Sequence, residues 1–410
     1  MVRPFTSLGR SFNGLWFATG SANLADGMAL FALPLLALAA GASPGGVAAV
    51  TMVLTLAWPV FGLHAGWIVD RVDRRALMTS VNLIRAGVLA VLTVVAATDR
   101  LSLAVVLAAA ALIGTAETLV DTALTSTVPL VVEPERRTRA NARIEATINV
   151  ANQLAGPPLA GALAGAALAL TVGTSAALYV LAVTGIAVIT LHRSPATTTT
   201  GTAPATGLTA GLRYVWRHGL IRALTLFTAT MNLVWGAAIA LLVVYAVSPG
   251  PLGLTPAQYG FMLTAMAAGG LLAAVLVEPL RRRIGVTRLL IVDCVGTILL
   301  VAPVAVGASA WAVAAGMVVA GAGASVWRIL VATIRQNLTP PELLGRVYAA
   351  SRVVSWGALP VGAGLAGLGA EIWDVRTVFA VGTVLAVGML TAFVPFAVRR
   401  DLSAAMSPVG

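Results

Sequence analysis

The chain has 410 residues, of which 59% are hydrophobic and only 10% are charged, and its mean hydropathy is +0.94. A water-soluble domain carries about 25% charged residues, so this composition excludes an ordinary soluble protein. The net charge is +11, and all 26 basic residues are arginines.

Apolar runs of 20 or more residues recur along the chain, and each is long enough to cross a hydrocarbon core of about 30 Å as a helix. We therefore predict an all-α integral membrane protein with twelve transmembrane helices. Their predicted ranges are 12–40, 45–69, 76–97, 101–131, 147–172, 173–192, 220–247, 259–278, 289–308, 311–334, 347–370 and 377–398.

A low-complexity stretch at 195–207, rich in Thr, Pro and Gly, divides these helices into two sets of six. We predict a first half at 1–192, a linker at 193–219 with an amphipathic helix over 208–219, and a second half at 220–410. A shift of about 208 residues relates charged loops in the two halves. Such a pseudo-symmetric repeat is one way to build an alternating-access carrier, with its substrate site near mid-membrane.

The arginines predict the orientation of the chain. Of the 26, 22 lie in alternate loops and at the termini, two lie on the opposite side, and two lie within helices. By the positive-inside rule, both termini are cytoplasmic in a multi-pass protein of the cytoplasmic (inner) membrane. Because this distribution accounts for the positive charge, we expect no nucleic-acid partner; the expected partners are membrane lipids, protons and a small molecule bound by a monomer.

Six charged residues fall near the bilayer centre in the predicted spans, where each costs roughly 2.5–3.5 kcal/mol unless it is paired, hydrated or protonated. They are Asp26, Arg85, Glu117, Asp121, Asp293 and Arg328. The repeat places Arg85 over Asp293 and Asp121 near Arg328, with opposite signs. It therefore predicts two ion pairs, Arg85 with Asp121 or Glu117 and Asp293 with Arg328, which either lock helices together or break during transport.

Asp26 has no basic residue in its own predicted helix. A buried carboxyl group without a partner can carry a proton near neutrality, so Asp26 is the first candidate for a proton-coupling group, and Glu117, Asp121 and Asp293 are further candidates. The alternative is that Asp26 only packs helices together through a hydrogen bond.

Polar residues at helical spacing suggest a substrate cavity with a few polar groups on an apolar wall. The alternative is that they bridge neighbouring helices. The candidates lie in the predicted first, fifth and seventh helices: Trp16, Asn23, Asn149, Asn152, Thr228, Asn232 and Trp235.

The loop between the second and third helices reads GWIVDRVDRR from Gly66 to Arg75. Together with Asp70, Arg71 and Arg74, these residues resemble the loop 2–3 signature of the major facilitator superfamily, except that Asp73 replaces the second glycine. The resemblance implies a charge relay of Asp70 and Arg74 with an acid on the fourth helix. Asp121 matches that acid, in competition with its pairing to Arg85, and both arrangements stay open.

Three longer stretches, at 114–161, 252–270 and 336–367, resemble the branch of this superfamily that contains macrolide-efflux and enterobactin-type siderophore exporters. Gly156, Pro157 and Gly161 are similar to the family's helix 5 antiporter signature, although Ala160 replaces one glycine. The resemblance implies the twelve-helix major facilitator fold and export rather than uptake.

These observations predict a proton-coupled exporter of lipophilic or amphipathic compounds such as macrolide-like drugs. Export of a siderophore or another endogenous metabolite, nutrient uptake and a non-transporting membrane sensor are the alternatives. The sequence has no Gly-x-x-x-x-Gly-Lys-[Ser/Thr] run for ATP, one cysteine (Cys294) and three scattered histidines. We therefore expect no cofactor, no metal site and no enzyme activity, with energy taken from a proton gradient.

Overall fold

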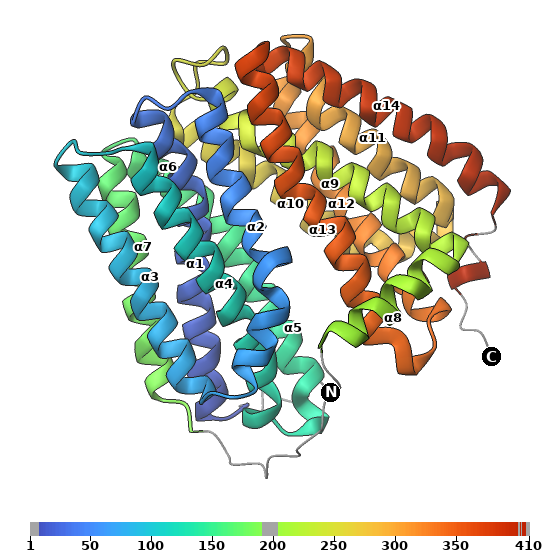
Figure 1. The fold of residues 1–410 in the computed structure, drawn as a ribbon, viewed down its shortest axis with the longest axis horizontal. Coiled ribbons are helices and arrows are strands. Elements are labelled where there is room, and N and C mark those ends of the chain that lie inside the picture. The colour runs from blue at the N-terminus through green and yellow to red at the C-terminus, as the bar shows by residue number, and fades with distance from the viewer. Residues whose placement is uncertain (1–7, 191–203, 401, 403, 407–410) are drawn as a thin grey trace. The chain divides into compact units, whose positions relative to one another are not determined.

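The computed structural model describes residues 8–190, 204–400, 402 and 404–406, and every regular element in those ranges is a helix (Figure 1). Eleven helices of the described chain are long and apolar enough to cross a membrane. The predicted class, a multi-pass all-helical membrane protein, is therefore confirmed.

The first part of the chain holds seven α-helices. They are α1 (Arg10–Ala39), α2 (Pro44–Val69), α3 (Arg74–Ala97), α4 (Leu103–Val131), α5 (Arg137–Ile148), α6 (Gly156–Ala164) and α7 (Leu168–Ala187). The short turn η1 (Pro134–Arg136) leads into α5, and the backbone between α5 and α6 is π-helical over η2 (Asn149–Ala155). Because α5, η2 and α6 run on without a break, we count them as one further crossing.

The second part, from residue 204 onward, also holds seven α-helices. They are α8 (Pro204–Arg217), α9 (Gly219–Ala246), α10 (Pro256–Ile284), α11 (Val286–Ala305), α12 (Ala310–Leu338), α13 (Leu344–Ile372) and α14 (Val375–Arg399). The short turns η3 (Pro341–Leu343) and η4 (Ala404–Met406) precede α13 and follow α14.

The predicted ranges of the fifth and sixth crossings were wrong. They were placed at 147–172 and 173–192, whereas the fifth crossing occupies 137–164 and the sixth is α7. The turn between them, Gly165-Ala166-Ala167, is as apolar as the helices that it joins, so hydropathy gives no sign of it. All twelve predicted ranges overlap helices of the structure, and only the fifth and sixth are displaced toward the C-terminus in this way.

Side-chain caps fix where several helices begin. Asp73 Oδ1 accepts a hydrogen bond from the Ala76 amide at 2.7 Å at the start of α3, and Asp374 Oδ1 accepts one from the Thr377 amide at 3.0 Å at the start of α14. Such caps satisfy amides that have no partner within the helix. The aspartate that departs from the loop signature, Asp73, thus has a structural role as the cap of α3.

The described residues form two compact units. Unit 1 lies within Met1–Ala40, Val60–Thr200 and Pro256–Gly260, and unit 2 lies within Gly41–Pro59, Gly201–Thr255 and Phe261–Gly410. The first half of α2 thus groups with unit 2. The predicted boundaries at 192 and 219 stay a prediction, and residues 191–203 of the predicted linker lie outside the described residues.

In unit 1, α7 packs along both α1 and α3, and α3 packs against α4. The backbones of α1 and the fifth crossing touch where Gly27 meets Asn152 and Gly156. A Cβ atom on Gly27 would lie 2.2 Å from the Asn152 carbonyl oxygen, and one on Gly156 would lie 2.9 Å from the Gly27 Cα. Only glycine allows this approach, which sets α1 directly against the π-helical segment.

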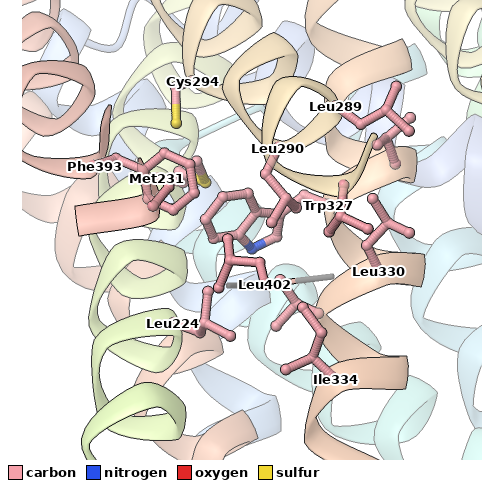
Figure 2. Packing of buried hydrophobic residues seen from close by; sticks show 14 of the residues in the cluster. Leu224, Met231, Leu289, Leu290, Cys294, Trp327, Leu330, Ile334, Phe393 and Leu402 are labelled. Atoms are coloured by element: carbon pink, nitrogen blue, oxygen red, sulfur yellow. The ribbon is translucent and has the colours of Figure 1, made fainter. Parts of the chain in front are cut away.

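Unit 2 has a large apolar cluster where α9, α11, α12 and α14 meet (Figure 2). Trp327 lies at its centre, with its ring centroid 5.3 Å from that of Phe393, and Cys294 is fully buried in the same cluster. The Trp327 indole donates to Thr228 Oγ1 at 2.9 Å, so its polar edge is satisfied.

The predicted amphipathic helix is present as α8, which packs on α13 within unit 2. The Tyr214 hydroxyl donates to the Leu338 carbonyl at 2.7 Å, and Val215 is buried while Trp216 is 46% exposed. One face of α8 therefore covers protein and the other is open, as its sequence pattern indicates.

Candidate functional site

An ion pair buried in unit 1 joins α1 to α3. Arg85 Nη2 donates to Asp26 Oδ1 at 2.5 Å, and the Tyr179 hydroxyl of α7 donates to the same oxygen at 2.6 Å. The guanidinium carbon lies 4.7 Å from the centroid of the Tyr179 ring. The three residues are at most 4% exposed. Three helices therefore meet on one carboxylate, which is hydrogen-bonded by a cation and a neutral hydroxyl group.

One expectation about this cluster was wrong, because Asp26 is not without a basic partner but pairs with Arg85. The expected pairing of Arg85 with Asp121 or Glu117 stays a prediction. Helical periodicity shows which residues share a face of one helix, but not which neighbouring helix that face meets. The acids of α4 nevertheless act electrostatically on Arg85.

A small cavity connects the ion pair with α4. It has a volume of about 10 Å³, and its polar lining residues are Thr19, Asn23, Asp26, Asn82 and Asp121. That volume is near the minimum that one water molecule needs. The carboxyl groups of α1 and α4 thus border one polar space, while Glu117 lies half-buried one turn before Asp121 on α4.

Arg85 has capacity for a second acid. Its Nε and Nη1 atoms are buried without a hydrogen-bond partner, and so is Asn82 Oδ1. A guanidinium has five N–H donors in a planar fork and can serve two carboxylates. Chemically, the cluster can hold a proton on an acid and exchange the partner of its one cation.

The second predicted ion pair was wrong. Asp293 of α11 is 3% exposed and its Oδ1 has no hydrogen-bond partner, whereas Arg328 of α12 is exposed and forms no ion pair with it within the described residues. Asp293 packs against Gly323 of α12 instead. Residues of opposite sign at equivalent repeat positions need not face one another. Gly323, which Asp293 contacts, precedes Arg328 by five residues on α12, so Arg328 points away from Asp293.

The loop signature holds the ends of three helices. Arg74 Nε donates to Ser126 Oγ of α4 at 3.1 Å, and Arg75 Nη2 donates to the Ala187 carbonyl at the end of α7 at 2.6 Å. Arg71 stacks on the Trp67 ring at 4.2 Å. Gly66 lies in the last turn of α2 with Asp70 just beyond it. The relay of Asp70, Arg74 and Asp121 stays a prediction.

Most of the expected cavity residues bond to backbone or to neighbouring helices. Asn23 Nδ2 donates to the Thr19 carbonyl, Asn149 Nδ2 to the Glu145 carbonyl, and Asn232 Nδ2 to the Ser355 carbonyl of α13. The bonds of Asn23 and Asn149 stay within their own helices, whereas the bond of Asn232 joins α9 to α13 and fits the alternative that polar residues bridge helices.

The remaining candidates have different surroundings. Thr228 accepts a hydrogen bond from the Trp327 indole, and the backbone of Asn152 packs against Gly27. Trp235 is half-buried on α9. Trp16 lines a wide groove on unit 1, apart from the small cavity beside Asp26. A role for any of these residues in substrate binding stays a prediction.

The expected kink in the fifth crossing lies at a change of helix type. Gly156 and Pro157 begin α6 directly after the π-helical η2, and both are buried. Gly161 packs on the backbone at Pro256, where a Cβ atom would lie 2.5 Å from the carbonyl oxygen. Proline removes an amide donor, and a π-helical turn absorbs the mismatch.

Comparison with known proteins settles the family. The model of the Major Facilitator Superfamily matches residues 15–355. This chain belongs to the Major Facilitator Superfamily. A curated relative, described as an uncharacterized MFS-type transporter y4rN of Sinorhizobium fredii, is 28% identical over 251 residues. That alignment covers 58% of this chain and 59% of the relative.

Solved structures of superfamily transporters share the fold. A mutant of the nucleoside transporter NupG superposes with a TM-score of 0.74 at 14% identity, covering 93% of this chain and 98% of that one. A bacterial homologue of the iron transporter ferroportin gives 0.72 at 19%, covering 96% and 100%. A bacterial homologue of the lysosomal transporter Spinster gives 0.68 at 15%, covering 99% and 98%. The protein is a membrane transporter rather than an enzyme.

Sequence reasoning missed Tyr179 in this transporter. It was passed over as one aromatic residue in an apolar helix, although the chain has only five tyrosines. A fully buried tyrosine hydroxyl needs a partner, and that need was the available signal. Tyr179 is the residue by which α7 joins the charge cluster.

Proposed function

We propose that this transporter is a proton-coupled exporter of lipophilic or amphipathic small molecules. The observation that carries the proposal is the buried carboxylate of Asp26, which is bonded by Arg85 and Tyr179 and lines a water-sized cavity together with Asp121 of α4. Buried ionisable residues in membrane segments are expensive and are commonly placed on ion pathways.

The charges of the cluster support proton coupling. Three carboxyl groups, those of Asp26, Glu117 and Asp121, act on one guanidinium, that of Arg85. In a buried setting one cation balances one carboxylate, so the others favour a bound proton. A proton arriving on Asp26 weakens its bond to Arg85, whose unused Nε and Nη1 donors then turn toward the α4 acids.

The direction and cargo rest on other features. Gly156, Pro157 and Gly161 of the fifth crossing are similar to the helix 5 signature of exporters in this superfamily. The few charges inside the helices favour a cargo with little charge of its own. The arginine-rich loops favour a cytoplasmic location for both termini in the cytoplasmic membrane.

The test is uptake into inside-out membrane vesicles that contain the protein, with and without an imposed proton gradient. The panel holds radiolabelled macrolides, cationic dyes and one siderophore. A nucleoside and Fe²⁺ represent the cargo named for two structural neighbours. Asp26→Asn is compared with wild type. Asp99→Asn, the same change at an exposed position, is the matched control.

We expect gradient-dependent uptake of at least one amphipathic compound, which Asp26→Asn abolishes and Asp99→Asn leaves intact. Uptake that Asp26→Asn does not change would move the coupling role to Glu117, Asp121 or Asp293. Flux of the siderophore, the nucleoside or Fe²⁺ alone would replace the cargo in this proposal. No gradient-dependent flux of any compound would reject proton-coupled export of this panel and favour a sensor.

A further inference from the structure

A wide groove lies on unit 1 between α1, α5 and α7. Its volume is about 750 Å³, which is in the range of sites that hold whole small molecules. The groove exists because α7 packs along α1 while α5 contacts α1 and not α7 to any comparable extent. The first part of the fifth crossing is therefore splayed from α7, with α1 forming the floor between them.

One end of the groove is cationic. Arg139 and Arg143 lie four residues apart on α5 and share a face, and both line the groove. Trp16 orients Arg143, whose guanidinium carbon lies 4.2 Å from the centroid of the Trp16 ring. The indole itself is fixed by donating to Thr147 Oγ1 at 2.5 Å. None of the described residues that line the groove is Asp or Glu.

Away from the arginines the walls of the groove are apolar. Phe17 and Leu24 of α1 and Leu178 and Leu181 of α7 form these walls, with Phe17 next to Trp16 and Leu24 about two turns further along α1. Phe17 is 47% exposed and Leu181 is 42% exposed, so these walls are open to their surroundings. Trp16 and Leu24 are separated by about 12 Å along the helix axis. The groove thus combines a positive end with an apolar end over the length of a lipid headgroup, its glycerol and the first part of its chains.

We propose that this groove binds one anionic phospholipid of the cytoplasmic leaflet, with its phosphate on Arg139 and Arg143. Both arginines lie near the start of α5, on the side where the arginine-rich loops place the cytoplasm. That leaflet carries the anionic lipids, and basic pockets between transmembrane helices on this side bind their headgroups. The acyl chains lie along the apolar wall of Phe17, Leu178 and Leu181.

The chemistry of the two ends selects this occupant. Two arginines on one face of α5 favour an anionic headgroup over a zwitterionic one. The exposed apolar wall favours a lipid over free phosphate, because free phosphate leaves that wall uncovered. A lipid seated here bridges α1, α5 and α7 and so holds the splayed start of the fifth crossing. The site does not depend on the cargo or the coupling ion of the transporter.

The test is binding of a fluorescent phosphatidylglycerol to the full-length protein purified in detergent, with phosphatidylcholine of the same chains and inorganic phosphate as comparison ligands. We expect Arg139→Gln with Arg143→Gln to weaken phosphatidylglycerol binding about tenfold or more, since hydrogen bonds to charged groups contribute about 1.5–3 kcal/mol. Arg282→Gln with Arg283→Gln removes two exposed arginines elsewhere and leaves binding unchanged.

The apolar end has its own matched pair. Leu181→Ser, which changes the groove wall, weakens lipid binding, while Val180→Ser, equally exposed on α7 but outside the groove, does not. If the double arginine variant does not purify, Arg139→Gln alone decides, because Arg139 is exposed and the contact of Arg143 with Trp16 stays. Equal binding of the two lipids, equal affinity in wild type and the arginine variants, or full displacement by inorganic phosphate would each overturn the proposal.

Discussion

Single residues decide the chemistry of unit 1, and the contact of Asp26 with Arg85 and Tyr179 is its buried ion pair. Removing one partner of a buried ion pair leaves a charge without compensation, which is costlier than removing both. The pair therefore makes a testable statement about stability as well as about transport.

We expect Asp26→Asn and Arg85→Gln each to lower the free energy of unfolding by about 3–5 kcal/mol. The double variant loses less than the sum of the two, by about 1–3 kcal/mol, because it also removes the partner that either single change leaves uncompensated. Denaturant unfolding of the purified protein in detergent measures all three. Asp99→Asn is the exposed control, and strictly additive losses would show that the pair is not coupled in the folded protein.

The residues of the charge cluster were predictable from sequence, but their partners were not. A charge within a long apolar run is visible by composition alone, so Asp26, Arg85, Glu117, Asp121 and Asp293 were all found. The pairing depends on how helices are rotated and which ones are neighbours. That information is absent from a single sequence, and for this reason the contact of Arg85 with Asp26 was not foreseen and the predicted pair of Asp293 with Arg328 was wrong.

At the scale of whole helices, hydropathy located the crossings but displaced the fifth and, with it, the start of the sixth, and the fifth is the informative case. The fifth crossing carries arginines and asparagines in its first half, changes to π-helical geometry, and ends at a turn of glycine and alanine. Its polar first half has the composition of a loop, and the apolar turn that follows it has the composition of a helix. Periodicity and polarity therefore placed it about ten residues too late.

The close contact of α1 with the π-helical segment of the fifth crossing gives the second prediction. Gly27→Ala forces a methyl group into the Asn152 carbonyl, so we expect a loss of about 1–3 kcal/mol in stability. Gly87→Ala places the same methyl group in open space on α3, where alanine favours the helix, and stability stays equal or rises by up to about 1 kcal/mol. Thermal unfolding of both variants measures the difference. Similar losses for both variants would mean that the close contact of α1 with the π-helical segment does not determine the loss of stability.

For the molecule as a whole, family membership gives the fold, and the arginine distribution gives a predicted orientation. Fold and orientation could be predicted from the sequence because each depends on the combined signal of many residues, so an error at one position matters little. The identity of the transported compound depends on a few side chains, and their contacts are defined only in the folded protein.

Orientation gives a third prediction, which the protein's own cysteine makes easy to test. Cys294 is fully buried, so it should not react with a membrane-impermeant maleimide, and the wild-type chain can serve as background. We expect Asp99→Cys to be labelled in intact cells and Glu135→Cys only after permeabilisation, since both positions are exposed on opposite predicted sides. The reverse pattern would invert the topology.

The π-helical segment has a consequence for insertions and deletions. Relative to an α-helix of the same rise, a π-helical turn accommodates one extra residue, and one residue is worth about 100° of rotation. Deleting a single residue there, such as Val150, would let the segment close into an α-helix and turn everything before it about the axis. Arg139 and Arg143 would remain in the sequence but leave the groove. The number of residues in the π-helical segment therefore determines the direction in which Arg139 and Arg143 point.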